Sequence, residues 1–322
     1  MERISPHVLL LSTKHDYSTD HVVWQLRQLG LSYVRLNRDQ LPQMQLELEP
    51  TPPSLVGKSE HQTFEITSET LRSIYFRAPV FLRDNYQPSI PPEEQFARSQ
   101  WAAFIRALTV FDSAFWINHP TPTYQAEIKP LQLATAAAVG FRIPRTVVTN
   151  SAKATALKSL GSQLATKVLD GVVLRVNEQE GFIYTHIVTS GELAEGEISS
   201  APIIVQEAIV PKVDIRVTVV GDRAFAAEIV SASGDGFSND WRINKSNIQY
   251  RPITLPSNVE NRCLQLVRKL GLVFGGIDLA LRGGEYFFIE INPTGEWAWL
   301  MPHTKYPIDY EIANMLAAGN NR

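Results

Sequence analysis

The stretch Gly275 to Trp299, GGIDLALRGGEYFFIEINPTGEWAW, contains two runs of β-branched and aromatic residues on either side of Gly283-Gly284. This pattern predicts a β-hairpin with a glycine-containing turn. The predicted strands span residues 277–281 and 286–291. Because successive side chains of a strand point to opposite faces, Glu290 and Asn292 share one face and the isoleucines beside them share the other. The hairpin is therefore predicted to have one polar face and one apolar face.

Asp278 joins Glu290 and Asn292 on the polar face only if it lies directly opposite Glu290. That pairing needs an odd number of loop residues, so we expect a three-residue loop, Gly283-Gly284-Glu285, with a glycine at positive φ. Two carboxylates and an amide oxygen form a hard-oxygen site suited to Mg²⁺ that also binds nucleotide phosphates. The alternative is an ordinary solvated sheet face. The sharp strand end at Pro293-Thr294-Gly295 favours the metal site.

Length and composition bound the class of protein. The chain has 322 residues and a net charge of -3, and it contains no basic tract typical of nucleic-acid binding. Its longest apolar runs, such as Val8 to Leu11, are too short to cross a bilayer. The N-terminus has no apolar signal segment, and the single Cys263, expected in the core, excludes an internal disulfide. We therefore expect a cytoplasmic protein with neither nucleic-acid nor membrane partners.

The N-terminal part of the chain predicts a separate domain over residues 1–118. Strands over 8–11 and 32–36 flank a helix over 19–29, which gives a βαβ opening. Since no glycine-rich phosphate loop follows the first strand, no nucleotide is assigned here. Arg77 and Arg83 are expected to be exposed, where arginines are usually solvated but could bind an acidic partner.

The remaining chain predicts two further domains, over residues 119–202 and 203–322, after a linker-like break at Asn118 to Pro122. Predicted helices span 124–139, 151–161 and 257–270, and predicted strands include 163–169, the hairpin over 172–187 and 214–220. In the last strand Asp214, Arg216 and Thr218 share one face, whereas the residues between them are apolar. These polar residues are spaced to face a cleft.

Taken in order, several of these motifs resemble the signature of ATP-grasp enzymes from about residue 118 onward. The motifs are Lys129, Lys167, Gln206-Glu207-Ala208-Ile209, Asp214-Ile215-Arg216, Asp278 and Glu290-Ile291-Asn292-Pro293. The resemblance implies an α/β (α+β) chain in which an N-terminal βαβ pre-ATP-grasp domain precedes an ATP-grasp fold of two mixed subdomains. It also implies ATP and Mg²⁺ as cofactors.

The resemblance assigns a role to each matching residue. It implies that phosphates are held by Lys129 and Lys167, that the adenine-facing hinge is Gln206, Glu207, Ala208 and Ile209, and that a further nucleotide contact is Asp214. Mg²⁺ would be held by Asp278, Glu290 and Asn292, and the residues near the acyl phosphate would be Arg216 and Arg242. Each lysine taken alone is better explained as a solvated surface charge.

Within ATP-grasp enzymes the chain is most similar to microviridin-type peptide cyclases, the graspetide synthetases, and more distantly to the glutamate ligases that extend a ribosomal protein. The residues that support this similarity are Ile143-Pro144, Thr149-Asn150, Asp240-Trp241-Arg242 and Glu290 to Glu296 followed by Trp299. The similarity implies an ATP-dependent ligase that activates Asp or Glu side chains of a ribosomally made peptide as acyl phosphates and closes ester or amide rings. In that family the hairpin over 172–187 helps to engage the leader of the precursor peptide.

Two features depart from the family pattern. The segment after Lys167 has fewer glycines than the usual phosphate-covering flap, and Tyr75-Phe76-Arg77-Ala78-Pro79 stands where the family often has a tyrosine with paired arginines. Two other functions stay open: a ligase that adds an amino acid or amine to a carboxylate, and an ATP-binding module without catalysis. The expected partner is a precursor peptide or another carboxylate substrate, and a symmetric homodimer is also left open.

Overall fold

The computed structural model describes residues 3–59, 62–77, 90–171, 173–176, 179–183, 185–231 and 248–320. Contacts within the chain divide it into two compact units. Unit 1 consists of Met1–Tyr124, Gly271–Gly275 and Pro293–Arg322, and unit 2 consists of Gln125–Leu270 and Gly276–Asn292. The finer division into three domains at residues 118 and 202 stays a prediction.

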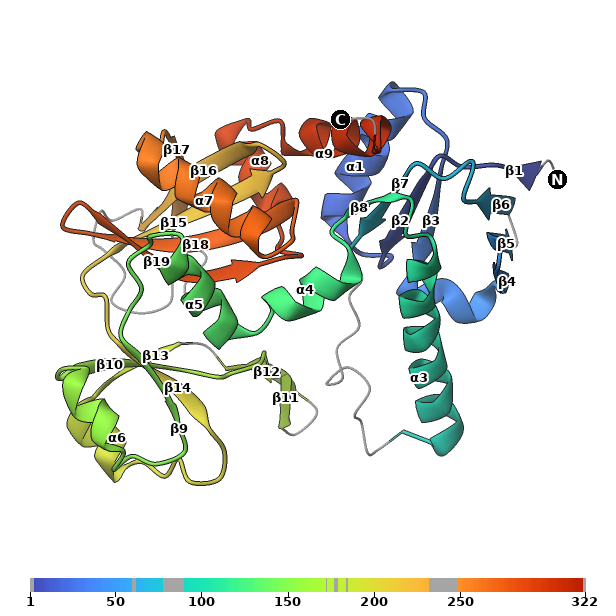
Figure 1. Ribbon diagram of the computed structural model, residues 1–322. Helices are drawn as coiled ribbons and strands as arrows, with labels where there is room; N and C mark the ends of the chain where they lie inside the picture. Colours follow the sequence, from blue (N-terminus) through green and yellow to red (C-terminus); the bar gives the residue numbers. More distant parts are fainter. Residues whose placement is uncertain are drawn as a thin grey trace. The chain divides into compact units, whose positions relative to one another are not determined.

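Unit 1 contains a parallel sheet with the strand order β3-β2-β7-β8 (Figure 1). Its strands are β2 (Val8–Ser12), β3 (Tyr33–Asn37), β7 (Ser73–Phe76) and β8 (Phe115–Ile117). The apolar run of β2 is fully buried, as expected for a central parallel strand. Helix α1 (Tyr17–Gln28) begins after Asp16, whose side chain accepts a hydrogen bond from the Thr19 backbone N–H, and it stops before Gly30, which has a φ of 66°. The predicted βαβ opening is confirmed.

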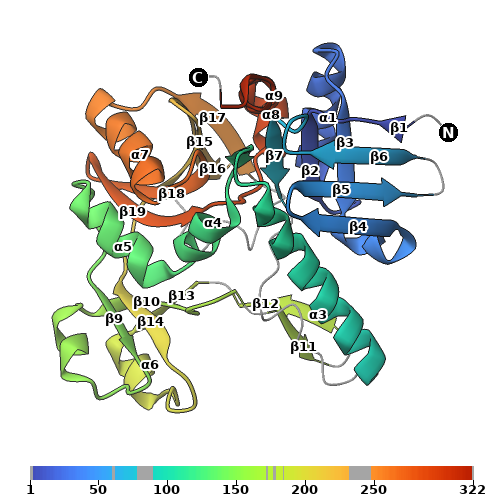
Figure 2. The ribbon, with the colours of Figure 1, turned by 45° about the vertical axis from the view of Figure 1, so that its right-hand side comes forward.

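A second four-stranded sheet in unit 1 has the order β1-β6-β5-β4, and its last three strands lie side by side in Figure 2. The strands are β1 (Arg3–Ile4), β4 (Gln45–Pro50), β5 (Pro53–Lys58) and β6 (Thr63–Thr67). Besides α1, this unit contains the helices α3 (Pro92–Ala107), α8 (Met301–Thr304) and α9 (Ile308–Ala318), with 3₁₀ turns at η1 (Arg38–Gln43), η2 (Leu108–Val110) and η6 (Ala298–Leu300). One apolar core joins both sheets to α3 through Leu9, Phe64, Phe76 and Ile105.

Unit 2 contains two sheets and a separate hairpin. An antiparallel sheet has the order β13-β10-β14-β9, formed by β9 (Thr146–Thr149), β10 (Gln163–Lys167), β13 (His186–Thr189) and β14 (Ile203–Glu207). The hairpin is formed by β11 (Val173–Val176) and β12 (Gln179–Phe182). The larger sheet has the order β17-β16-β15-β18-β19, formed by β15 (Val213–Val220), β16 (Arg223–Ser231), β17 (Ile248–Ile253), β18 (Phe274–Arg282) and β19 (Glu285–Asn292).

The five-stranded sheet is covered on one face by two helices, α5 (Lys129–Ala138) and α7 (Ser257–Lys269) (Figure 1). Helix α7 packs against β15 and β16, and α5 packs against β19. Cys263 lies on the buried side of α7, as predicted, and burial together with the Glu260 carboxylate raises the pKa of its thiol to about 12. This thiol is therefore protonated near neutral pH and belongs to the core. No helix of the described chain is both long and apolar enough to cross a membrane.

Two helix predictions are wrong. The predicted helix over 124–139 is two helices, α4 (Pro120–Ala126) and α5, because Pro130 lies in the first turn of α5, where a missing N–H costs nothing. The break places Lys129 at the start of a helix. The predicted helix over 151–161 is only the 3₁₀ turn η3 (Thr155–Ser159), since its buried side chains, Leu157 and Leu160, are three residues apart and fit one tight turn.

Candidate active site

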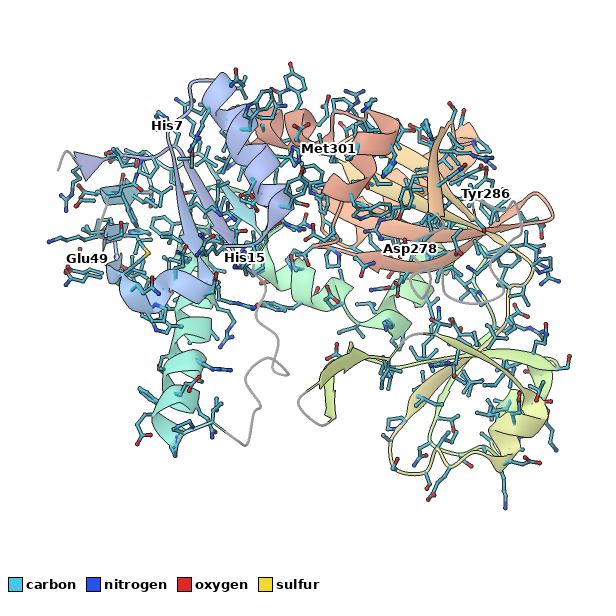
Figure 3. The ribbon with its side chains drawn as sticks, turned by 180° about the vertical axis from the view of Figure 1, so that it is seen from behind. His7, His15, Glu49, Asp278, Tyr286 and Met301 are labelled. Carbon is cyan, nitrogen blue, oxygen red and sulfur yellow. The ribbon has the colours of Figure 1, made fainter. Side chains whose placement is uncertain are left out.

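The hairpin of β18 and β19 places the predicted metal ligands together. Asp278 lies directly opposite Glu290, and Asn292 lies opposite Gly276. Figure 3 shows Asp278 on this sheet, with Tyr286 farther along the hairpin toward its turn. The predicted pairing of the two carboxylates is confirmed. Because residues two apart in a regular strand stretch share a face, Asp278, Glu290 and Asn292 lie on one side of the hairpin.

The predicted three-residue loop is wrong. Arg282 pairs with Glu285, which leaves a two-residue turn, Gly283-Gly284. Both glycines have positive φ, 58° and 81°, as a tight type I′ turn requires and as two adjacent glycines allow without steric cost.

A β-bulge reconciles the two-residue turn with the carboxylate pairing. The register shifts between Asp278 and Leu279, which pairs with Phe288, so Ile289 is the extra residue on β19. A shift of one residue moves every later side chain of the strand to the opposite face. The bulge therefore returns Glu290 to the same side as Asp278, which a regular ladder from this turn would not do.

A buried arginine lies against Asp278. Arg216 of β15 donates a hydrogen bond from Nη1 to Asp278 Oδ1 over 2.9 Å, and the two side chains are only 8% and 14% exposed. Gly276 leaves the space for this guanidinium, since a Cβ there would lie 2.3 Å from Arg216 Nη2. On the same strand Asp214 forms an ion pair with Lys212. On the predicted polar face of β15, the Asp214 and Arg216 side chains are thus largely buried, and each forms an ion pair with another residue of the protein.

Substitution of Gly276 by Ala is expected to lower the free energy of unfolding by about 1–3 kcal/mol, because the new methyl group displaces the Arg216 guanidinium from Asp278. Chemical denaturation measures this effect. The matched control is Gly191→Ala, where the nearest atom to a Cβ is 3.8 Å away, and stability should be unchanged or slightly higher. Equal stability of the Gly276 variant and the wild type would contradict the tight fit around Arg216.

The donor set on the hairpin fits Mg²⁺. The described residues contain no group of three or more His, Cys, Asp or Glu side chains placed to hold a metal. The opposed pair Asp278 and Glu290 would therefore be completed by the Asn292 amide oxygen and by oxygens of water or of a ligand. Mg²⁺ is commonly bound in this way, through one or two carboxylates together with waters and substrate phosphates. Arg216 offsets part of the negative charge on the hairpin when no metal is bound.

The two lysines predicted to hold phosphates lie on different elements, and a hydrogen bond connects the first lysine to the residue that follows the second. Lys129, the first residue of α5, donates a hydrogen bond from Nζ to the Val168 carbonyl over 2.9 Å. Val168 directly follows Lys167, the last residue of β10. The structure therefore brings the Lys129 ammonium group to the end of the strand that carries Lys167.

The predicted adenine-facing segment lies at the end of β14, an inner strand of the four-stranded sheet of unit 2. Gln206 is buried, and its Nε2 donates to the Thr146 hydroxyl over 2.9 Å. The Glu207 carboxylate accepts hydrogen bonds from Arg145 N and Nε at 3.1 and 2.7 Å. The next two residues complete the segment: the Ala208 N–H donates to the Gln163 carbonyl, and Ile209 is buried. The polar side chains of this segment therefore bind protein groups, and so do the backbone N–H groups of Glu207 and Ala208.

Arg242 and Arg83 lie outside the described residues. Arg77 is not exposed as expected, since its side chain is only 3% exposed within unit 1. It pairs with Asp16 and Glu296 and donates to the carbonyls of Thr294 and Gly295. Burial lowers the pKa of this arginine, but the nearby Tyr75, Asp16 and Glu296 raise it more, so the guanidinium stays charged. Arg77 therefore anchors the segment that follows β19.

Two buried amides that the sequence did not single out hold the backbone next to the predicted metal ligands. Gln132 of α5 hydrogen-bonds both the N–H and the carbonyl of Ile291, at 3.1 and 2.9 Å. Asn118 donates to the carbonyl of Pro293 over 2.8 Å. In the sequence Gln132 is one polar residue in an alanine-rich helix and Asn118 starts an expected linker. The available signal was that Gln132 falls among the apolar positions of its helix.

The chain was compared with known proteins by sequence and by structure. Neither a scan of protein-family models nor a search of curated proteins gives a match. Among solved structures, macrocyclase MdnC from Microcystis aeruginosa, bound with precursor peptide MdnA, matches with a TM-score of 0.81 and 25% identity, covering 98% of this chain and 99% of that one. Macrocyclase MdnB from the same organism matches with a TM-score of 0.75 and 26% identity, covering 97% and 99%.

A RiPP-associated ATP-grasp ligase from Chryseobacterium gregarium, in complex with ADP and a leader and core peptide, matches with a TM-score of 0.81, 23% identity and 96% coverage of both chains. These matches show that the chain has the ATP-grasp fold, which confirms the predicted α/β fold class and the predicted superfamily. Within that fold its full-length neighbours include macrocyclases and a RiPP-associated ligase, as the closer resemblance predicted.

Proposed function

We propose that this chain is an ADP-forming ATP-grasp ligase that closes ester or amide rings in a ribosomally made precursor peptide. The observation that carries this proposal is the end-to-end match with MdnC and MdnB, which extends over both units rather than over a shared nucleotide module alone. We place the activity in the cytoplasm, where ATP and newly made peptides are both present.

ATP and Mg²⁺ are the proposed cofactors. Asp278, Glu290 and Asn292 would hold Mg²⁺, whose charge neutralises the phosphate oxygens during transfer. Lys129 and Lys167 would bind the phosphates. Their proposed role is supported by the hydrogen bond that brings Lys129 to the residue after Lys167.

The nucleotide has two further proposed contacts. Residues 206–209 would form the hinge that faces the adenine, where Thr146 and Arg145 hold the Gln206 and Glu207 side chains. Asp214 would contribute a further nucleotide contact from the polar side of β15, beside its partner Lys212.

The proposed reaction has two steps. A side-chain carboxylate of the peptide attacks the γ-phosphorus of ATP, the bond from that phosphorus to the bridging oxygen breaks, and an acyl phosphate and ADP form. A hydroxyl or amine of the same peptide then attacks the acyl carbon, loses its proton and expels phosphate. Arg216 is fixed by Asp278 and presents a positive charge where negative charge develops. Arg242 is the second arginine proposed near the acyl phosphate.

Mass spectrometry of a co-expressed precursor peptide tests the proposed reaction. The expected product has lost the mass of one water for each ring, because every ester or amide forms by net condensation, and ADP accumulates in step with it. A precursor whose mass rises by that of an amino acid or amine less one water would identify the other ligase reaction instead. A precursor of unchanged mass, with a matched leader and with ATP and Mg²⁺ present, would contradict both.

A further inference from the structure

β19 carries two of the proposed metal ligands, yet it is the edge strand of its sheet. The outward N–H and carbonyl groups of an edge strand have no strand partner and need other ones. At Ile291, between Glu290 and Asn292, both groups bind the Gln132 side chain. Gln132 is 3% exposed, and its Nε2 also donates to the Ala126 carbonyl over 2.6 Å, which fixes the amide in one orientation.

The other neighbour of Asn292 is held in a similar way. Asn118, 2% exposed, donates from Nδ2 to the carbonyls of Pro293 and Phe274, both at 2.8 Å. Its Oδ1 accepts the N–H of Phe274, the first residue of β18, over 2.9 Å. The residues before and after Asn292 are therefore each tied to a buried side-chain amide.

We infer that Gln132 is a positioning residue for the metal site: it fixes the Ile291 backbone and thereby the directions of the Glu290 and Asn292 side chains. Gln132 lies three residues after Lys129 on α5. The same helix therefore carries the proposed phosphate lysine and the tether to the metal-bearing strand. This inference rests on the proposed function, since it concerns the metal of that site.

The packing of α5 against β19 does not by itself set the directions of the Glu290 and Asn292 side chains. Helix α5 already buries Leu133 and Ala136, but such apolar contacts are non-directional and do not by themselves fix the orientation of the Ile291 peptide groups. Two hydrogen bonds between one amide and Ile291 fix the strand in direction as well as in distance, and the third, to the Ala126 carbonyl, holds the amide itself. Residues that orient metal ligands in this way typically change metal affinity about 10–100-fold when they are replaced.

The test compares Gln132→Met, which keeps the length but makes none of these hydrogen bonds, with Leu133→Ala, which weakens the packing of the same helix but keeps the Gln132 amide that binds Ile291. Mg²⁺ is titrated at a fixed saturating concentration of ADP, and the rise in Tm gives the half-effective Mg²⁺ concentration. We expect this concentration to increase about ten-fold or more in Gln132→Met. In Leu133→Ala it should stay at the wild-type value, although the ligand-free Tm falls.

The outcomes separate the inference from the proposed function. If the wild type responds to Mg²⁺-ADP and Gln132→Met has the half-effective concentration of Leu133→Ala, the positioning role is overturned alone. If the wild type shows no Mg²⁺-dependent response to ADP, the metal site and this inference are overturned together. Gln132→Asn, which keeps the amide on a shorter side chain, should also raise the half-effective concentration and replaces the Met variant if that one does not fold.

Discussion

Glu290→Gln is expected to lower the rate of ring formation about a thousand-fold, which corresponds to about 4 kcal/mol of lost transition-state stabilisation. The substitution preserves size but removes one of the two opposed carboxylates, while Asp278 keeps its bond to Arg216. The remaining carboxylate then has to hold Mg²⁺ while it is already paired with a guanidinium. Product formation followed by mass spectrometry measures the rate.

The same variant should lose the stabilisation that Mg²⁺-ADP gives to the wild type. A ligand at one hundred times its Kd stabilises the native state by about 2.7 kcal/mol, and thermal unfolding with and without Mg²⁺-ADP measures it. Glu285→Gln is the matched control, because Glu285 is on the same strand but forms an exposed ion pair with Arg142. That control should retain rate and stabilisation, and a Glu290→Gln variant that does the same would refute the metal hairpin.

The polar face of the hairpin was predictable because it depends only on alternation and on residue type. Asp278 and Glu290 meet as the sequence indicates, but the route differs. Either a loop with an odd number of residues or a β-bulge shifts the pairing of the two strands by one residue, and either one places these carboxylates on one face. Gly283-Gly284 favours the tight turn, so the extra residue is absorbed at Ile289. No sequence pattern marks a bulge at an isoleucine, so the sequence could not show that a bulge rather than an odd loop pairs the two carboxylates.

The residues that orient the site were not predictable from local pattern. Arg77 pairs with Asp16, 61 positions earlier in the chain, and with Glu296, 219 positions later. Gln132 meets Ile291 across 159 positions. A buried polar side chain needs partners, but which partners it finds is set by the packed fold rather than by neighbouring residues. The candidate site residues could thus be predicted from sequence motifs, whereas the residues that hold them in place could be identified only in the structure.

Arg216→Ala is expected to lower turnover about 10²–10³-fold without raising the half-effective concentration of Mg²⁺. The loss in turnover follows from removing a fixed positive charge beside the reacting groups. The metal effect has the opposite sign from that of Glu290→Gln, because Arg216 competes with Mg²⁺ for the Asp278 carboxylate in the ligand-free protein. Removal of this competitor leaves Asp278 more available to the metal.

Stability measurements test the same competition. Without ligand, Arg216→Ala removes the guanidinium from a largely buried carboxylate, so the free energy of unfolding should fall by about 3 kcal/mol. Mg²⁺-ADP should restore more of that loss than it adds to the wild type, since the metal replaces the missing positive charge. Arg142→Ala, which breaks the exposed pair with Glu285, should change stability by less than about 1 kcal/mol and leave turnover intact. If Arg216→Ala instead raised the half-effective Mg²⁺ concentration, Arg216 would be a support for the metal site rather than a competitor for Asp278.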